Sequence, residues 1–514
     1  RPSFPDLVVG LSQAWRERRD EVDAQASRIG SLVRAELAAP AERAPLDPGL
    51  ATAAFEGLLR HHDPAEGGFG GAPKFPQPVY LELLQSRSDD PRAVAATRRT
   101  LDRISVGGIH DHLGGGIHRY AVDGTWTVPH FEKMLYDQGQ LAAVLATHLE
   151  RHADPWLERM LRRLVAYLER EMLEADGCLR SAQDAEVDAR EGASFVWTPE
   201  EIDAVLPPED AAFARAIFGL DGGPNFRDPH HPEDRPRSVL RLRERIDDPA
   251  VVARLDDVSE RLRAARDRRP QPSIDDKVLA GWNGLAITGL ARAGAVLGDA
   301  GIIALAGRVA DAVLSRLGSP DGVRRTARGD RVEIDAFLED HALLAEGLLA
   351  LHEATGDPRR LDTAAELVAE ARSRFRDHAT GIWFDTPEGR GDLLVRACSI
   401  VDGAVPSGGG TMMRVLATLA DRTGETRHLD DLASFLAAMS ATIREHPAGA
   451  IRAVMALETL ARLDPERAGT LARLGMVAGR IGDADDPAGD EGRDPARGDD
   501  GVRARLHPES TPMH

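Results

Sequence analysis

Residues 155–172 read PWLERMLRRLVAYLEREM, and their apolar side chains recur every three or four positions. The apolar set is Trp156, Leu157, Met160, Leu161, Leu164, Val165, Leu168 and Met172. Because an α-helix turns once in about 3.6 residues, this spacing places the whole set on one helical face. A helix with one apolar and one charged face covers a protein core. The segment therefore predicts an amphipathic helix.

The same period recurs along most of the chain. Similar stripes run through about 132–152, 277–298, 301–317, 337–355, 359–376, 411–422, 428–444 and 451–463. Short Gly, Asp and Pro breaks separate them, which predicts antiparallel helical hairpins. Longer glycine-rich loops recur at 63–76, 107–125, 176–194, 321–333, 379–392 and 402–410. Such loops favour a closed ring over an open solenoid, so we expect an all-α toroid whose functional residues lie at one mouth.

Three regions differ from this pattern. Residues 1–45 contain a charged amphipathic helix over 6–38, which we expect to connect the toroid (46–480) to something upstream, since the chain opens without Met. An insertion at about 198–272 begins with Thr198-Pro199-Glu200-Glu201, a capping box with Pro at the first helical position. Residues 481–514 are rich in Asp, Gly, Arg and Pro, and they predict a disordered tail.

The composition narrows the function classes. The 514 residues carry a net charge of −20, so we expect neither a nucleic-acid nor a membrane partner. No stretch has the roughly 18 uncharged apolar residues that span a bilayer. Cys178 and Cys398 form no CxxC, which argues against a disulfide framework and a thiolate zinc site. A reducing, cytoplasmic setting is the simplest interpretation.

Lysine is rare in this chain. Of 64 basic residues only three are Lys, namely Lys74, Lys133 and Lys277. Arg has replaced Lys wherever a planar guanidinium serves, so we expect the remaining three at places that need a compact ammonium. Chance is the alternative. All three lie in segments dense in Gly, Pro and aromatic residues, which favours substrate binding.

The densest of these segments is 107–137, GGIHDHLGGGIHRYAVDGTWTVPHFEKMLYD. Val128-Pro129 predicts the start of a helix, with Glu132 in its first turn. Candidate acid–base residues are Asp111, His112, His130, Glu132 and Asp137, and candidate binding residues are Arg119, Tyr120, Trp126 and Lys133. In the simpler interpretation Glu132 only complements the helix dipole, and Lys133 and Asp137 form an i,i+4 ion pair on the helix. The His spacing matches no metal site, so we expect no metal and no cofactor.

Other segments have the same mixture of glycine, aromatic and charged residues. Residues 67–76, GGFGGAPKFP, contain Lys74, and residues 275–284, DDKVLAGWNG, place an acid, a base and polar groups at a helix start. From these and weaker segments we add Asp276 and Asp340 as catalytic candidates, and Lys74, Lys277, Trp282, Asn283 and Asp402 as binding candidates. Asp276 as a helix N-cap is the alternative. We expect Asp111, His112, His130, Glu132, Asp276, Asn283 and Asp340 to converge on one mouth.

At these motifs the chain resembles the YyaL-like and spermatogenesis-associated protein 20 family, over about residues 1–465. The markers are 67–76, 111–120, 129–137, 196–201, 275–285 and 402–408. The resemblance implies a six-hairpin, glycosidase-like (α/α)6 toroid that follows an N-terminal thioredoxin-like domain, which this chain lacks. Gln183 stands where the family usually has Glu, and His341 and Gly409 replace a usual Tyr and Asn.

Two functions remain open. The first is a carbohydrate-active hydrolase or epimerase that acts on a sugar-like small molecule through carboxylate and His acid–base chemistry. The second is a non-catalytic binding or regulatory module paired with the thioredoxin-like domain. Unpaired carboxylates facing one another, Asp111 or Glu132 against Asp276 or Asp340, are expected for the first, and a closed net of ion pairs for the second.

Overall fold

The computed structural model describes residues 3–37 and 42–474, so the tail predicted over 481–514 lies outside it. The single helix predicted over 6–38 is two helices, α1 (Phe4–Glu17) and α2 (Arg19–Leu37). They separate at Arg18, whose φ of −133° and ψ of 44° are not helical. One residue out of helical geometry leaves the apolar period almost unchanged, so the sequence pattern did not show the break.

Six of the described helices form a closed inner ring. They are α4 (Pro78–Ser86), α6 (Leu135–Arg151), α11 (Ala280–Leu297), α13 (Leu338–Thr355), α15 (Gly408–Thr423) and α18 (Ile451–Leu463). Each contacts the next in this order, and α18 in turn contacts α4. The ring therefore closes on itself, which confirms the all-α toroid over the open solenoid.

A second layer of helices packs on the ring and alternates with it along the chain. It consists of α3 (Gly49–His61), α5 (Pro91–Val106), α7 (Pro155–Tyr167), α12 (Ala300–Leu317), α14 (Pro358–Phe375) and α16 (Thr426–Ala438), followed by the short α17 (Ser440–Glu445) and α19 (Pro465–Leu471). The Asp residues in the chain breaks start several of these helices, because Asp90, Asp154 and Asp357 accept backbone N–H groups as N-caps. The breaks are thus hairpin turns, as the sequence predicts.

Glycines let three inner helices approach closely. A Cβ on Gly139 of α6 would lie 2.6 Å from the Leu285 carbonyl carbon of α11. A Cβ on Gly284 of α11 would clash with the Leu343 carbonyl of α13. No larger side chain fits at these backbone contacts, so both positions require glycine for packing and not for an unusual φ.

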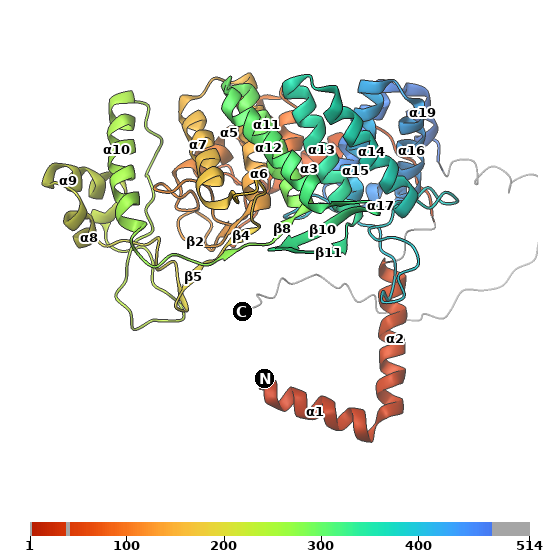
Figure 1. Cartoon of the computed structure of the whole chain (residues 1–514), viewed down its shortest axis with the longest axis horizontal. Coiled ribbons are helices and arrows are strands. Elements are labelled where there is room, and N and C mark those ends of the chain that lie inside the picture. Colours follow the sequence, from red (N-terminus) through yellow and green to blue (C-terminus); the bar gives the residue numbers. More distant parts are fainter. Residues whose placement is uncertain (1–2, 38–41, 475–514) are drawn as a thin grey trace, which may run out of the picture. The chain divides into compact units, whose positions relative to one another are not determined.

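Short strands gather at one end of the ring, where the inner helices begin (Figure 1). Strand β3 (Lys133–Met134) pairs with β4 (Ala182–Gln183), which pairs with β7 (Ile274–Asp275). Strand β8 (Val278–Leu279) pairs with β10 (Gly322–Arg328), which pairs with β11 (Arg331–Asp335). We call this end, where α6, α11 and α13 follow β3, β8 and β11, the mouth.

Two local predictions were wrong at the mouth. The helix expected from Pro129 begins at Leu135, because 129–134 is extended: β2 (Pro129–His130) pairs with β1 (Tyr120–Ala121) and Lys133 pairs with Gln183. Glu132 is therefore not in a helical first turn. Lys133 precedes the helix that contains Asp137 and pairs with Asp111, so the expected i,i+4 ion pair does not form. The loop expected over 321–333 is mostly the hairpin β10–β11.

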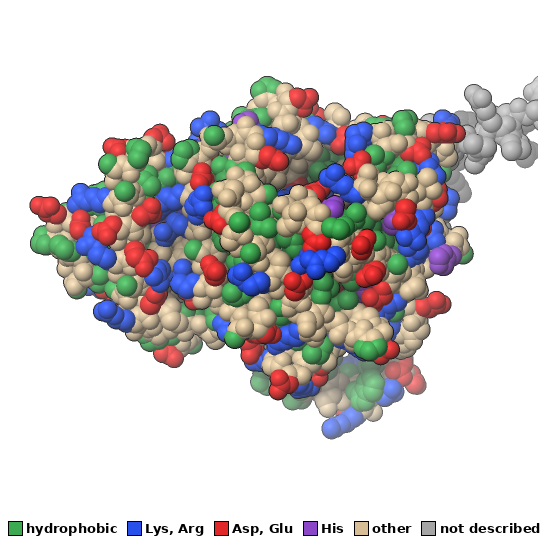
Figure 2. Space-filling view, turned by 45° about the horizontal axis from the view of Figure 1, so that its top comes forward, with side chains coloured by type: hydrophobic (Ala, Val, Ile, Leu, Met, Phe, Trp, Pro, Cys, Tyr) green, Lys and Arg blue, Asp and Glu red, His purple; other side chains and the backbone are tan. Residues whose placement is uncertain are grey.

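The insertion carries its own helices, α8 (Pro199–Val205), α9 (Pro208–Ile217) and α10 (Pro249–Arg266). The capping box at Thr198 is present, with Glu201 bonded back to the Thr198 amide. Within the described residues no helix combines the length and hydrophobicity that a bilayer span requires. Basic and acidic side chains are interspersed over the face shown in Figure 2.

Buried charges link opposite sides of the inner ring. Arg452 of α18 donates to Glu346 of α13 and to Glu82 of α4, both at 2.7 Å, and is almost fully buried. Arg414 of α15 pairs with the same two glutamates. The network ties four inner helices together, and the buried charges of Arg452 and Glu346 depend on their partners because little water reaches them.

This network yields a stability prediction. We expect Glu346→Gln to lower the free energy of unfolding by roughly 3 kcal/mol, because Arg452 would keep a buried charge with one partner fewer. Glu353 is the matched control two turns along the same helix, exposed and paired with Arg422 at 2.8 Å. Glu353→Gln should lower the free energy of unfolding by less than about 1 kcal/mol. Equal losses in urea denaturation would contradict the structural role of the network.

Candidate active site

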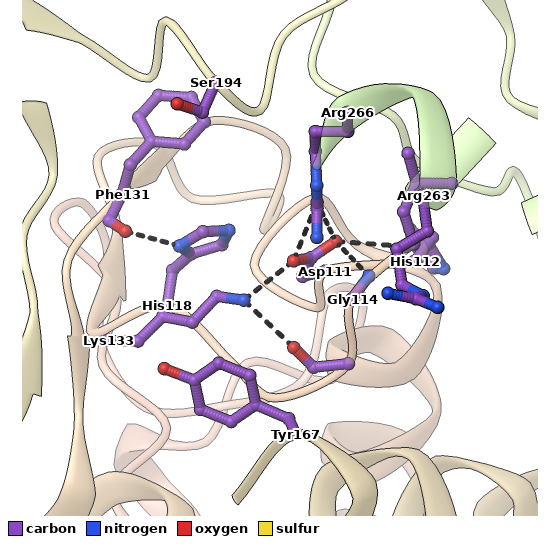
Figure 3. Close-up of polar contacts among 12 residues, drawn as sticks. Asp111, His112, Gly114, His118, Phe131, Lys133, Tyr167, Ser194, Arg263 and Arg266 are labelled. Carbon is purple, nitrogen blue, oxygen red and sulfur yellow. Dashed lines mark hydrogen bonds and ion pairs between the residues drawn. The ribbon is translucent and has the colours of Figure 1, made fainter. Parts of the chain in front are cut away.

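Asp111 is the centre of a buried charge cluster behind the mouth (Figure 3). Its carboxylate accepts from Lys133 Nζ at 2.7 Å and from Arg266 Nη1 at 2.8 and 2.9 Å. It also accepts the backbone N–H groups of Leu113 and Gly114. Burial alone would raise the pKa of Asp111, but the charges of Arg266 and Lys133 hold it well below its ordinary value. Asp111 thus stays charged and has no free oxygen for a ligand.

The two buried lysines, Lys74 and Lys133, make equivalent contacts in two different loops. Lys133 Nζ donates to Asp111 and to the Gly115 carbonyl, and Lys74 Nζ donates to Asp63 and to the Gly67 carbonyl. In each loop one compact ammonium bonds a carboxylate and a glycine carbonyl in a site that a guanidinium would overfill. Lys277 differs, because it is 47% exposed and pairs with Asp275 at 3.0 Å.

Histidines of the 107–137 segment are mostly internal. His112 Nε2 donates to the Gly107 carbonyl, and His118 Nδ1 donates to the Phe131 carbonyl. Burial lowers the pKa of His112 to about 4, and burial together with the Lys133 charge lowers the pKa of His118 to about 3. Both rings are therefore neutral at pH 7, and their hydrogen bonds hold the glycine-rich loop in place.

Three further candidates bond to the protein itself. Asn283 is buried and exchanges hydrogen bonds with the backbone of Leu179. Asp402 accepts from Ser407 and from the Arg452 amide. Trp126 is buried, and its indole N–H donates to the Glu66 carbonyl. These side chains shape the loops around the mouth and do not reach into it.

Asp340 and Asp276 are both paired with arginines of β10. Asp340 accepts from Arg325 at 2.8 Å and from the amides of Gly281 and Phe337. Burial raises the pKa of Asp340, although the positive charge of Arg325 lowers it in part. Asp276 is half-exposed and accepts from Arg328 at 2.7 Å. The unpaired, facing carboxylates expected between these two and Asp111 or Glu132 are therefore not present.

A second group of candidates does come together at the mouth. Arg119 donates to Glu132 at 3.1 Å, and His130 lies 3.7 Å from the same carboxylate. His130 also donates to Glu191 of the 176–194 loop at 2.8 Å, which raises the pKa of the imidazole. Tyr120 stacks on His130 with ring centres 5.1 Å apart. All of these side chains are partly exposed, so a ligand can touch them.

Asp137 is the exception among the candidate carboxylates. It lies in the first turn of α6, is 3% exposed, and its Oδ2 atom has no hydrogen-bond partner. Burial raises the pKa of Asp137 well above its ordinary value. The positive charge of Arg119 lowers this pKa in part, and the negative charge of Glu132 raises it further. Burial of this kind favours the protonated form of a carboxyl group. Buried carboxyls that stay protonated are a recurrent feature of functional sites.

The side chains next to Asp137 complete the site. Tyr136 meets Trp282 edge to face with ring centres 4.8 Å apart, and Gln140 donates to the Ala404 carbonyl of the loop 402–407 at 2.8 Å. Val405 of that loop packs on the same cluster. The loop therefore lies over the first turn of α6.

Sequence reasoning missed Tyr136, Gln140 and Glu191 as site residues. For the first two, adjacency to Asp137 on one helix was an available signal. Glu191 gave none, because only the fold brings it 2.8 Å from His130.

Cavities lie both beside the mouth and away from it: one of about 280 Å³ is lined by Arg190, Glu191 and Asp228, next to His130. Another of about 490 Å³ is lined by the opposite, C-terminal ends of α6, α11 and α13, including Glu150, Arg292 and Glu353. Alanines make up much of its lining, and none of the candidate residues from the sequence lies in it, so we place the chemistry at the mouth. The described residues hold no group of three or more side chains arranged to bind a metal ion.

Comparison with known proteins gives relatives of the whole toroid. No protein-family model matches the chain. Spermatogenesis-associated protein 20 of Rattus norvegicus is 30% identical over 534 aligned residues, which cover 93% of this chain and 67% of that protein. Its Homo sapiens counterpart is 31% identical over 506 residues, covering 89% and 64%. The chain thus spans about two thirds of the length of these relatives, and the resemblance predicted from the motifs is confirmed.

Solved structures align more distantly. Cellobiose 2-epimerase from Bacillus thermoamylovorans gives a TM-score of 0.49 at 8% identity, over 78% of this chain and 87% of the other. D-mannose isomerase gives a TM-score of 0.49 at 10% identity, and the alignment covers 75% of this chain and 83% of the isomerase. An unsaturated glucuronyl hydrolase specific for heparin gives 0.47 at 9% identity, over 82% and 97%. No residue of this chain receives a role from these alignments.

The Asp111 cluster yields a prediction on lysine identity. We expect Lys133→Arg to lower the free energy of unfolding by about 1–3 kcal/mol, because a guanidinium overfills the site between Asp111 and the Gly115 carbonyl. Lys277→Arg, exposed on the surface, should change it by less than about 0.5 kcal/mol. Chemical denaturation of both variants measures the difference, and equal effects would mean that the scarcity of Lys is chance.

The buried histidines yield a prediction on pH. Between about pH 6.5 and 4 the unfolded chain binds protons that folded His112 and His118 reject, so stability falls as pH falls. We expect His118→Gln to remove on the order of 2 kcal/mol of that fall. Urea denaturation across this range measures how the free energy of unfolding changes with pH. His446→Gln, at an exposed position, should leave the slope unchanged, and an unchanged slope in the His118 variant would refute the assignment.

Proposed function

The chain belongs to the spermatogenesis-associated protein 20 family, and from that premise and the mouth geometry we propose an acid–base enzyme for a sugar-like small molecule. The observation that carries the proposal is the unpaired, buried carboxyl of Asp137. It is the one candidate acid that is not neutralised by a described cation or donor. The whole protein's activity is part of the same proposal, because the chain spans only part of its relatives.

Asp137 has the properties of a general acid. Its raised pKa favours the protonated form, and it lies in the first turn of α6, where the charges of Arg119 and Glu132 act on it. A side chain that donates a proton in the transition state accelerates a reaction typically by about 10²–10⁴-fold. In hydrolysis of a glycoside, Asp137 gives its proton to the departing oxygen as the C–O bond breaks.

Glu132 is the complementary base. Its carboxylate pairs with Arg119 at 3.1 Å and lies 3.7 Å from His130. A charged carboxylate beside a protonated one is the division of roles that hydrolysis needs. Glu132 takes the proton of the attacking water as the new C–O bond forms, so the protons balance over the cycle.

Aromatic side chains at the mouth support a sugar-like ligand. Trp282 is partly exposed beside Tyr136, and Tyr120 is partly exposed beside His130. Flat aromatic faces pack against the apolar face of a sugar ring, while polar neighbours fix its orientation. Both kinds of group are present around Asp137.

One observation favours a second function, a binding module that works with a thioredoxin-like domain. Asp111, Glu132, Asp276 and Asp340 are all neutralised by Lys or Arg. A closed net of this kind suits a rigid scaffold, which holds a ligand without needing to transfer protons. The two functions differ only in what Asp137 does.

Asp137→Asn tests that difference. We expect turnover of disaccharides and nitrophenyl glycosides to fall by about 100-fold or more, with binding retained, because the amide has no acid proton. Asp276→Asn, at a half-exposed paired acid, is the control and should keep activity. A wild-type chain that binds sugars but converts none would favour the second function.

The same variant has a stability readout. Above about pH 4 the unfolded chain releases the Asp137 proton while the folded chain keeps it, so wild-type stability falls as pH rises. The stability of the Asp137→Asn variant should not decrease in this way as the pH rises. Denaturation at a series of pH values measures it, and identical pH profiles would show that Asp137 titrates normally.

A further inference from the structure

We propose a second ligand site, separate from the mouth: a groove between α7 and α10 that binds the phosphate group of a small phosphate monoester through Arg159 and Arg163. Helix α10 of the insertion lies beside α7 of the outer layer (Figure 1), and Asp256 of α10 pairs with Arg159 of α7. None of the candidate residues of the mouth lines the groove. The site therefore does not depend on the chemistry assigned to Asp137.

The groove is open to solvent and has room for a small molecule. Its volume is about 480 Å³, within the range of roughly 300–1,000 Å³ that small-molecule sites span. Solvent reaches it, because the side chains of Arg162 and Asp256 are 46% and 44% exposed. A phosphate group occupies only part of this space, so we expect the rest of the ester to pack on Pro155 and Ala166. The lining consists of Pro155, Glu158, Arg159, Arg162, Arg163 and Ala166 of α7 and Asp256 of α10.

Two of the three arginines share one carboxylate. Arg159 Nη2 lies 2.5 Å from Asp256 Oδ1, and Arg163 Nη1 lies 3.7 Å from the same atom. Positions 159 and 163 are one turn apart on α7, so their side chains are neighbours on the helix surface. The two guanidinium groups carry two positive charges and Asp256 carries one negative charge. An anion in the groove supplies the second negative charge.

The third arginine has carboxylate partners of its own. Arg162 pairs with Glu158 at 2.9 Å and lies 3.6 Å from Asp299, which is outside the groove. Its charge is therefore balanced without a ligand, and only Arg159 and Arg163 are assigned to the phosphate.

The positive charge of this pair acts on its surroundings. Burial and the charge of Arg159 lower the pKa of Arg163 to about 10, although Asp256 raises it in part. Burial is the main cause of the low pKa of His112, and the charges of both arginines lower that pKa further. The whole chain has a net charge of −20, so its overall field does not attract anions. Binding of an anion here would therefore report the local arrangement of charge.

The guanidinium groups are held in place before a ligand arrives. Arg159 uses Nε and Nη2 for Asp256, at 2.8 and 2.5 Å. Arg163 uses Nη2 for the carbonyls of His112 and Leu113, at 2.7 and 2.9 Å, which fixes its side chain to the glycine-rich loop. The Nη1 groups of both arginines take no part in these hydrogen bonds. Planar, pre-positioned guanidinium donors match the oxygens of a phosphate group.

Calorimetric titration of the whole chain with glycerol 3-phosphate tests the site, at pH 7 and a fixed ionic strength of about 0.15 M. Glycerol is the neutral control, and inorganic phosphate carries the recognised group alone. We expect the ester to bind, inorganic phosphate to bind several-fold more weakly, and glycerol not to bind. No binding of the ester, or equal binding of glycerol, overturns the site. Equal or tighter binding of inorganic phosphate overturns the assignment of an ester.

Two variants with opposite expected effects locate the bound phosphate. Arg159→Gln removes a charged donor and should lower the affinity for glycerol 3-phosphate at least about tenfold, the value of one charged hydrogen bond. Asp256→Asn removes the carboxylate that competes for the same guanidinium groups and should raise the affinity several-fold. Arg359→Gln is the matched control, because Arg359 of α14 pairs with Asp357 at 2.8 Å outside the groove. It should leave the affinity unchanged.

The opposite signs separate ligand binding from a structural role. Arg159→Gln and Asp256→Asn break the same ion pair, so a structural role alone would lower the affinity in both variants. A fall in Asp256→Asn as large as that in Arg159→Gln overturns the proposal. An unchanged affinity in an Arg159→Gln chain, shown by urea denaturation to be folded, also overturns it.

The outcomes are independent of the proposed function. Phosphate binding that depends on Arg159, in a chain that converts no sugar, upholds this site and removes the catalytic proposal. Turnover that depends on Asp137, in a chain that binds no glycerol 3-phosphate, does the reverse.

Discussion

The buried carboxylate of Asp111 is the constraint on which the mouth depends. Lys133 and Arg266 bring two positive charges to it from β3 and from the end of α10, so the glycine-rich segment, the strand before α6 and the insertion are fixed to one point. A buried charge is tolerated only when it is paired and hydrogen-bonded. Arg119 and Glu132 lie between Asp111 and Lys133 in the chain, so both ends of the segment that carries them are held at this cluster.

The same principle divides the acidic residues into two kinds. Asp111, Asp340 and Asp402 are buried and fully occupied by donors, so their charge serves to hold loops and helix starts. Asp137 is buried as deeply but has an unpartnered oxygen. Burial without a partner raises the cost of the charged form, and this difference in environment, not in residue type, marks Asp137 for chemistry.

The ring and the mouth are also connected through Arg452. Its side chain binds Glu82 and Glu346 across the inner ring, while its backbone N–H donates to Asp402 at the base of the loop 402–407. That loop in turn accepts from Gln140 of α6. The position of the loop over the first turn of α6 is thus set by the packing of helices that are distant in sequence.

The sequence by itself determined the helices, the closed ring and the region of the site, because these follow from local periodicity, helix-breaking residues and glycine-rich motifs. The helical stripe at 155–172 and the motifs around Asp111, Glu132 and Asp137 were all visible there. Only the tertiary structure decided which polar residues are anchors and which are free. That distinction depends on partners such as Arg266 for Asp111 and Glu191 for His130, which lie 155 and 61 residues away in the chain. The pKa and accessibility of a group are set by burial and by neighbours in space, and no local pattern encodes either.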